Sequence, residues 1–161
     1  MKKELALVLG VFAIAFTFGY NADASSLIES FAQLQGSILS QPLIYIFLRI
    51  LLQNALICAL MFFGGYLLSI PTFFLLITNG FSLGILFHYF ATQSSTLSVI
   101  VRLIPHGLFE LPAFFLSATY GLIITTKVIQ KKKASPKLFL PILILLIIAA
   151  FVETLLIFLS K

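Results

Sequence analysis

Residues 43–90 read LIYIFLRILLQNALICALMFFGGYLLSIPTFFLLITNGFSLGILFHYF, an almost unbroken apolar stretch of the chain. A membrane span needs about 20 apolar residues to cross about 30 Å of hydrocarbon, so this stretch is too long for one span and too short for three. Because a proline removes a backbone donor and interrupts a helix, we place a turn at Ser69 to Pro71. We expect two spans, over residues 43–68 and 72–90, the first of them bent near Gly64.

Three further apolar runs flank this stretch and predict spans over residues 5–20, 108–126 and 138–160. The composition agrees, because 61% of the residues are hydrophobic and 9% are charged, with a mean hydropathy of +1.16. A soluble domain carries about 25% charged residues, which is far more than this chain could supply. The sequence therefore predicts an all-α fold, a polytopic membrane helix bundle of about five transmembrane helices, in a single membrane domain over residues 1–161.

The first run follows Met1-Lys2-Lys3 and also resembles a secretory signal, because Ala22-Asp23-Ala24 has the form of a cleavage site. We favour an uncleaved first span or signal anchor over residues 1–20. Residues 21–41 form the predicted outer loop. Apolar side chains recur there at helical spacing, at Leu27, Ile28, Phe31, Leu34 and Ile38. This spacing is typical of a short helix at the membrane surface or of an ordinary amphipathic connector.

The basic residues predict the orientation of the bundle. With the amino terminus inside, seven lysines fall on the inner face: Lys2, Lys3, Lys127, Lys131, Lys132, Lys133 and Lys137. The outer face receives only Arg102 and Lys161. Cytoplasmic loops are enriched in Lys and Arg, so we expect the amino terminus inside and the carboxyl terminus outside. This topology accounts for the net charge of +5 without a nucleic-acid partner.

Polar residues inside the predicted spans are the candidate functional or structural positions, because a charge within hydrocarbon costs at least about 2.5 kcal/mol. They are Arg49, Asn54, Asn79, His88, His106, Glu110 and Glu153. Asn79 falls in the middle of its span, and most of the others fall toward the outer leaflet. One interpretation is a buried network in which Arg49 pairs with Glu110 or Glu153 and the asparagines bridge helices. A second is a path for a substrate, lipid or proton. A third is a metal or hydrolytic site, although a His-x-x-x-Glu spacing is weak evidence for one.

Small residues and prolines suggest where helices approach closely and where they begin. Gly80 and Gly84 lie four residues apart on one face of the third span, which predicts a tight seam with a neighbouring helix. The lone Cys58, in an apolar run, is interpreted as a packing residue. In the fourth span we expect a tight turn at Gly107, followed by a helix that carries Pro112 in its first turns.

Two segments carry a resemblance to a known family. Residues 79–84 read NGFSLG, and residues 105–113 read PHGLFELPA. Together with Asn54, the pair Gly64-Gly65 and Phe151-Val152-Glu153, they resemble the stage II sporulation protein M family of integral membrane proteins. The resemblance covers residues 43–160, which would form a four-helix family-like core. It implies a membrane protein that works beside peptidoglycan-degrading partners during engulfment of the forespore, and it implies no catalytic residue.

We therefore expect a non-enzymatic scaffold or complex subunit in the cell membrane of a prokaryote, linked to envelope remodelling. Its expected partners are the lipid bilayer and other membrane or envelope proteins, and a homo-oligomer is left open. We expect no catalytic residue, metal or cofactor. The first alternative is a small permease or transporter subunit whose polar site lies in the outer leaflet half. The second is an intramembrane metal-dependent hydrolase that uses the neighbouring His106 and Glu110.

Overall fold

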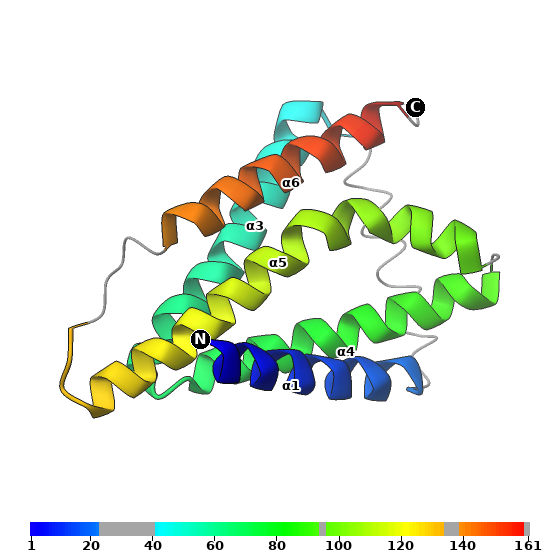
Figure 1. Ribbon diagram of the computed structural model, residues 1–161. Helices are drawn as coiled ribbons and strands as arrows, with labels where there is room; N and C mark the ends of the chain where they lie inside the picture. Colours follow the sequence, from blue (N-terminus) through cyan, green and yellow to red (C-terminus); the bar gives the residue numbers. More distant parts are fainter. Residues whose placement is uncertain (23–40, 94–95, 134–138, 160–161) are drawn as a thin grey trace.

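The computed structural model describes residues 1–22, 41–93, 96–133 and 139–159, and for residues 93 and 96–106 it describes the backbone alone. Within these residues the chain forms five long helices and one short 3-10 helix, labelled as in Figure 1. They are α1 (Lys2–Tyr20), α3 (Leu43–Phe63), the 3-10 helix η1 (Gly64–Leu67), α4 (Ile70–Gln93), α5 (Thr96–Ile129) and α6 (Phe139–Leu159). The helix or connector expected within residues 21–41 falls mostly outside the described residues.

Among the described residues, five segments are long and apolar enough to cross a membrane: Lys2–Tyr20, Leu43–Leu67, Ile70–Thr92, Gly107–Ile129 and Phe139–Leu159. The prediction of an all-α bundle with five spans is confirmed, and the predicted bounds differ from these by three residues or fewer. The orientation of the bundle in the membrane stays a prediction.

The apolar side chains of these helices point outward as well as inward. On α3, large apolar residues at four-residue intervals are exposed, from Ile44 and Leu48 through Leu52 to Leu56 and Leu60. In water such a continuous apolar surface would drive aggregation, whereas in a bilayer it is the surface that faces lipid. The outward faces therefore agree with the membrane assignment.

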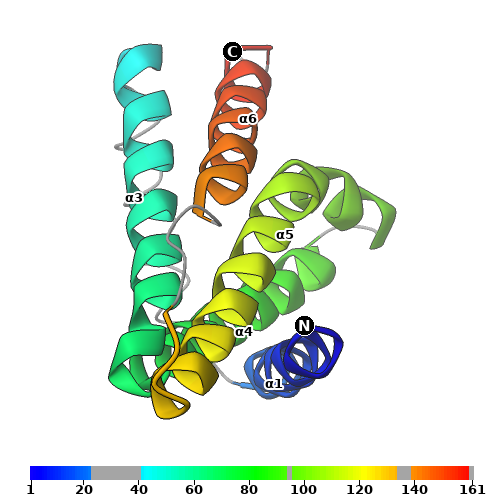
Figure 2. The ribbon, with the colours of Figure 1, turned by 60° about the vertical axis from the view of Figure 1, so that its left-hand side comes forward.

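Successive helices run in alternating directions, so their ends gather at two opposite ends of the bundle (Figure 1). One end holds Met1, η1, the end of α5 and the start of α6, and we call it the inner end, following the predicted orientation. α1 lies along α4, while α3 and α6 pack against α5 and against each other (Figure 2). The core therefore runs between helices, and its buried members include Phe62, Met61 and Leu146.

The turn between α3 and α4 lies close to the predicted position. Leu68 and Ser69 adopt left-handed backbone angles, with φ of 56° and 60°. Such angles are uncommon outside glycine. α4 then begins at Ile70, which places Pro71 in its first turn. A proline is tolerated there because the first-turn N–H groups have no partner within the helix, so Pro71 starts the helix and the turn precedes it.

The expected tight turn and helix start at the fourth span are wrong, although the bounds of the span itself agree. α5 is one helix of 34 residues from Thr96 to Ile129, and it visibly bends along its length (Figure 1). Gly107 makes no tight turn, because it lies inside the continuous helix α5. Pro112 lies well inside the helix and not in its first turns. A proline within a helix removes one backbone hydrogen bond and favours a bend, which membrane helices tolerate.

Candidate functional site

Asn54 and Glu110 form the contact that joins two of the predicted polar residues. Asn54 is on α3 and Glu110 is on α5, and the Asn54 side-chain amide donates a hydrogen bond to Oε1 of Glu110. Glu110 is 7% exposed, and its neighbours on α5 include the buried Ala113 and Ser117. The carboxylate is therefore held between helices and away from the lipid-facing surface.

Arg49 is not part of this contact. Among the described residues Arg49 forms no hydrogen bond or ion pair with either Glu110 or Glu153, and Asn54 is the residue that hydrogen-bonds Glu110. The reason is the direction of the side chain on α3. Tyr45 and Gln53, one turn before and one turn after Arg49, are both exposed. Asn54 lies on the side of α3 that faces α5, and Arg49 does not.

The other predicted residues are spread over three helices. Asn79 donates to the carbonyl of Leu75 in its own helix, at 2.7 Å, so this hydrogen bond does not bridge helices. His88 packs edge-on against the ring of Tyr20, with ring centroids 4.9 Å apart. Glu153 is half-buried on α6. His106 lies on α5 where the structure describes the backbone alone.

A metal centre would need several ligands close together. Within the described part of the chain, no three side chains of His, Cys, Asp or Glu are placed to hold a metal ion. The hypothesis that pairs His106 with Glu110 stays untested, because the His106 side chain is outside that part.

The glycine seam predicted for α4 packs against α1. A Cβ built on Gly84 would lie 2.1 Å from the carbonyl oxygen of Phe16, and one on Gly80 would lie 2.9 Å from that of Phe12. Gly19 on α1 lies equally close to α4, because a Cβ there would lie 2.0 Å from the carbonyl oxygen of Phe81. The backbones of α1 and α4 therefore touch, as small residues at four-residue spacing permit.

A second polar contact, which the sequence reasoning missed, lies at the inner end. We call it the inner junction; it consists of Gly65, Ser69, Thr72, Gly121 and Thr125. The Thr125 hydroxyl donates to the carbonyl of Gly65 at 2.8 Å and lies 2.6 Å from the hydroxyl of Ser69. Thr72 donates to the carbonyl of Met61 at 2.7 Å. Ser69 and Thr72 are each 1% exposed. Thr125 thus fastens the turn between α3 and α4 to α5, and Thr72 ties the start of α4 to the end of α3.

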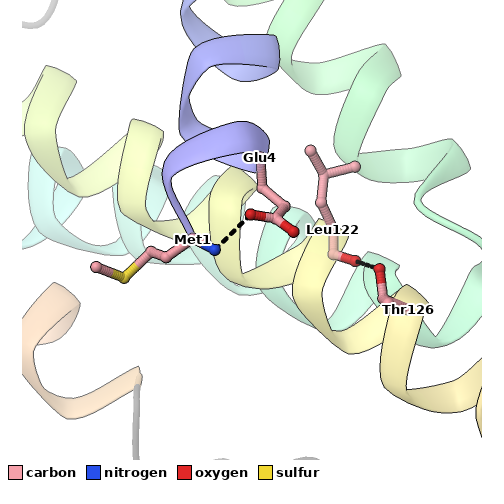
Figure 3. A network of polar contacts seen from close by, with 4 residues as sticks. All are labelled: Met1, Glu4, Leu122 and Thr126. Atoms are coloured by element: carbon pink, nitrogen blue, oxygen red, sulfur yellow. Dashed lines mark hydrogen bonds and ion pairs between the residues drawn. The ribbon is translucent and has the colours of Figure 1, made fainter.

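The amino terminus also lies at the inner end, against α5. The amine of Met1 forms an ion pair with Glu4 at 2.5 Å. Beside it, Thr126 of α5 donates to the carbonyl of Leu122 at 3.1 Å (Figure 3). The two contacts are neighbours but belong to separate helices, so the charged terminus is neutralised within α1 itself.

A groove of about 440 Å³ opens between the outer ends of α3 and α6. Its lining is apolar except for one hydroxyl, and consists of Leu43, Ile44, Phe47, Phe151, Thr154, Leu155 and Phe158. Thr154 uses its hydroxyl on the carbonyl of Ala150 in its own helix, at 2.7 Å. None of the predicted polar residues lines this groove.

The five apolar helices, the lipid-facing side chains and the buried contacts between helices define a multi-pass α-helical membrane protein. The profile of the stage II sporulation protein M family matches residues 5–156, and the chain belongs to this family. An uncharacterized protein of Methanocaldococcus jannaschii is 34% identical over 170 residues, covering 95% of this chain and 93% of that relative. No solved structure shows a significant match.

Proposed function

We propose that this chain is a non-enzymatic scaffold or complex subunit of the plasma membrane of a prokaryote, and that its complex takes part in remodelling the cell envelope. Membership of the stage II sporulation protein M family supports the proposal, because the resemblance implies partners that act on peptidoglycan. The protein's own contribution would be to hold such partners at the membrane. This role needs a stable bundle with surfaces for other proteins.

The observation that carries the proposal is the buried hydrogen bond between Asn54 and Glu110. A transport site needs a wet path to its polar groups, and a carboxylate in such a path is usually accessible to water. Glu110 is 7% exposed and links α3 to α5. The outer groove is apolar and is lined by other residues. A polar group that joins two helices accounts for both residue types without chemistry.

The test is the exchange Glu110→Gln, which keeps the shape and leaves an oxygen to accept the hydrogen bond from Asn54. We expect the variant to keep the melting temperature of the wild-type protein in detergent. In native membranes solubilised gently, both should migrate in a particle larger than the 17.8 kDa chain alone, together with the same proteins.

Two outcomes would contradict the proposal. A wild-type chain that never migrates with another protein would remove the role of complex subunit. A Glu110→Gln variant that folds and assembles normally but loses all cellular function would favour the small permease or the hydrolase, because both use the ionisable proton that glutamine lacks.

A further inference from the structure

The surface of α3 that faces away from the bundle carries a polar stripe, which consists of Tyr45, Arg49 and Gln53. These residues are four positions apart and so lie one above the other on a helix. Tyr45 is 48% exposed, Gln53 is exposed and Arg49 is half-buried. The residues around the stripe are large and apolar, with Leu52 at 66% and Leu56 at 60% exposure. The stripe therefore lies on a surface that otherwise suits lipid.

Such a stripe is costly in hydrocarbon. A charged or amide side chain without a partner there loses its hydrogen bonds to water, at a cost of at least about 2 kcal/mol each. Within the described part of the chain, neither Arg49 nor Gln53 has a recorded hydrogen bond or ion pair. The stripe thus has donors and a positive charge, and a partner outside this chain can satisfy both.

Depth distinguishes a lipid headgroup from a protein as that partner. Arg49 lies six residues from Leu43, the first residue of α3, or about 9 Å along the helix. A long arginine side chain at this depth can reach the headgroups. Gln53 lies ten residues from Leu43, or about 15 Å, which is near the middle of a hydrocarbon core of about 30 Å. A headgroup does not reach that depth, whereas a side chain on a transmembrane helix does.

We propose that the stripe of Tyr45, Arg49 and Gln53 is the docking surface for a transmembrane helix of another protein, and that this helix carries a carboxylate in the outer half of the membrane. The carboxylate pairs with Arg49, and a polar side chain or backbone carbonyl accepts from Gln53. The proposal rests on the proposed role as a complex subunit and names the surface through which the complex forms.

Charge complementarity favours another protein over a second copy of this chain. The carboxylates within the described spans are Glu4, Glu110 and Glu153. Glu4 pairs with the amino terminus at the inner end. Glu110 is buried against Asn54, and Glu153 also takes part in a polar contact within the chain. Within the described spans, a second copy would have to break one of these contacts to supply the carboxylate, and the two remaining acidic residues, Asp23 and Glu29, belong to the predicted outer loop and not to a span.

The experiment is site-specific photo-cross-linking in native membranes. A photo-reactive amino acid in place of Leu52 reports on the stripe, and the same amino acid in place of Ile148 reports on the lipid-facing side of α6, where the side chain is 40% exposed. We expect position 52 to form an adduct with one membrane protein, through a span that contains Asp or Glu, and position 148 to form none with that protein.

The charge of Arg49 is then changed in the protein that carries the cross-linker at position 52. Arg49→Leu should lower the adduct yield at least about tenfold, because it removes one member of a charge pair, and Arg49→Lys should restore most of it. Because Arg49 faces outward, both variants should keep the wild-type melting temperature in detergent.

Three outcomes would overturn the inference: adducts with lipid alone, adducts between two copies of this chain, or an adduct that is indifferent to Arg49. If the chain migrates with its partner but the adduct yield does not change in the Arg49 variants, the proposed docking surface is wrong and the proposed function stands. If the chain migrates with no other protein, both are wrong.

Discussion

Two of the places where polar side chains join helices, both within the described residues, are built differently. In the outer half, α3 and α5 are joined by one amide and one carboxylate, those of Asn54 and Glu110. At the inner junction, short hydroxyls bond one another and backbone carbonyls: Thr125 joins α5 to η1 and to Ser69, and Thr72 joins α4 to α3. There the helices touch through glycine: a Cβ built on Gly121 would lie 2.4 Å from the carbonyl oxygen of Met61.

This difference shows that the length of a polar side chain determines how closely the two helices that it joins must pack. Asn and Glu have side chains long enough to meet across an ordinary distance between helices, so their contact asks little of the backbone. A serine or threonine hydroxyl reaches a carbonyl on another helix only where the backbones nearly touch, and glycine permits that approach. The inner junction therefore combines several hydrogen bonds with close packing, and we expect it to carry more of the stability of the bundle.

The largest expected effect comes from Gly65→Ala in the inner junction. The new Cβ would lie 2.2 Å from the carbonyl oxygen of Gly121 and 2.7 Å from Cβ of Ile124. Both distances are too short, so the backbones must separate and the hydroxyl contacts stretch. We expect a loss of about 3 kcal/mol or more, measured as a fall in the melting temperature in detergent.

Gly10→Ala on α1 is the matched control, because nothing lies within 4 Å of a Cβ built there. It should leave stability unchanged or raise it by up to about 1 kcal/mol, since alanine is the better helix former. If the Gly65→Ala variant has the same melting temperature as the Gly10→Ala variant, the helices at the inner junction are packed less closely than the structure describes.

The next effect is that of Asn54→Leu, which tests the outer contact. The change leaves Glu110 without the hydrogen bond from Asn54, in a position that is 7% exposed. We expect a loss of about 1–2 kcal/mol of unfolding free energy. Gln53 is the neighbouring residue on the outward side, and Gln53→Leu should change the unfolding free energy of the isolated protein by less than about 0.5 kcal/mol. Equal effects of the two changes would mean that Asn54 contributes nothing through Glu110.

Much of the fold could be predicted from the sequence, because a membrane span is a local property. Length and hydropathy placed all five spans, and the spacing of Gly80 and Gly84 indicated a seam before its partner helix was known. The start of α5 was not predictable in the same way. Pro105 and Gly107 usually interrupt a helix in water, whereas helix α5 continues through both of them without a break.

The contacts between helices could be predicted only in part, because they depend on which faces meet. Charge drew attention to Glu110, which is indeed buried, but the choice of Asn54 over Arg49 depends on the rotation of α3. Nothing in the sequence indicated that Ser69, Thr72 and Thr125 join helices. Serine and threonine are common in membrane helices, and their hydroxyls usually donate to a backbone carbonyl of their own helix. Thr126 does so at 3.1 Å to Leu122, one position from Thr125.

The smallest expected effect contrasts these two neighbours, through Thr125→Val and Thr126→Val. Valine keeps the branched shape of threonine and removes only the hydroxyl. Because a hydroxyl has one proton and Thr125 donates to Gly65, Ser69 must donate to Thr125. Thr125→Val therefore removes two contacts between elements and leaves the hydroxyl of Ser69 buried at 1% exposure.

We expect Thr125→Val to cost about 1 kcal/mol, the usual worth of a hydrogen bond between membrane helices, and Thr126→Val to cost less than about 0.3 kcal/mol. The double change Thr125→Val with Ser69→Ala should cost less than the sum of the single changes by about 0.5 kcal/mol, because each single change already breaks the shared hydrogen bond. Unfolding in mixed micelles measures all four proteins against the wild type. If the two valine variants unfold alike, or if the double change is additive, the hydroxyls of the inner junction do not act together. Close packing at Gly65 and Gly121 would then account for the stability of this end by itself.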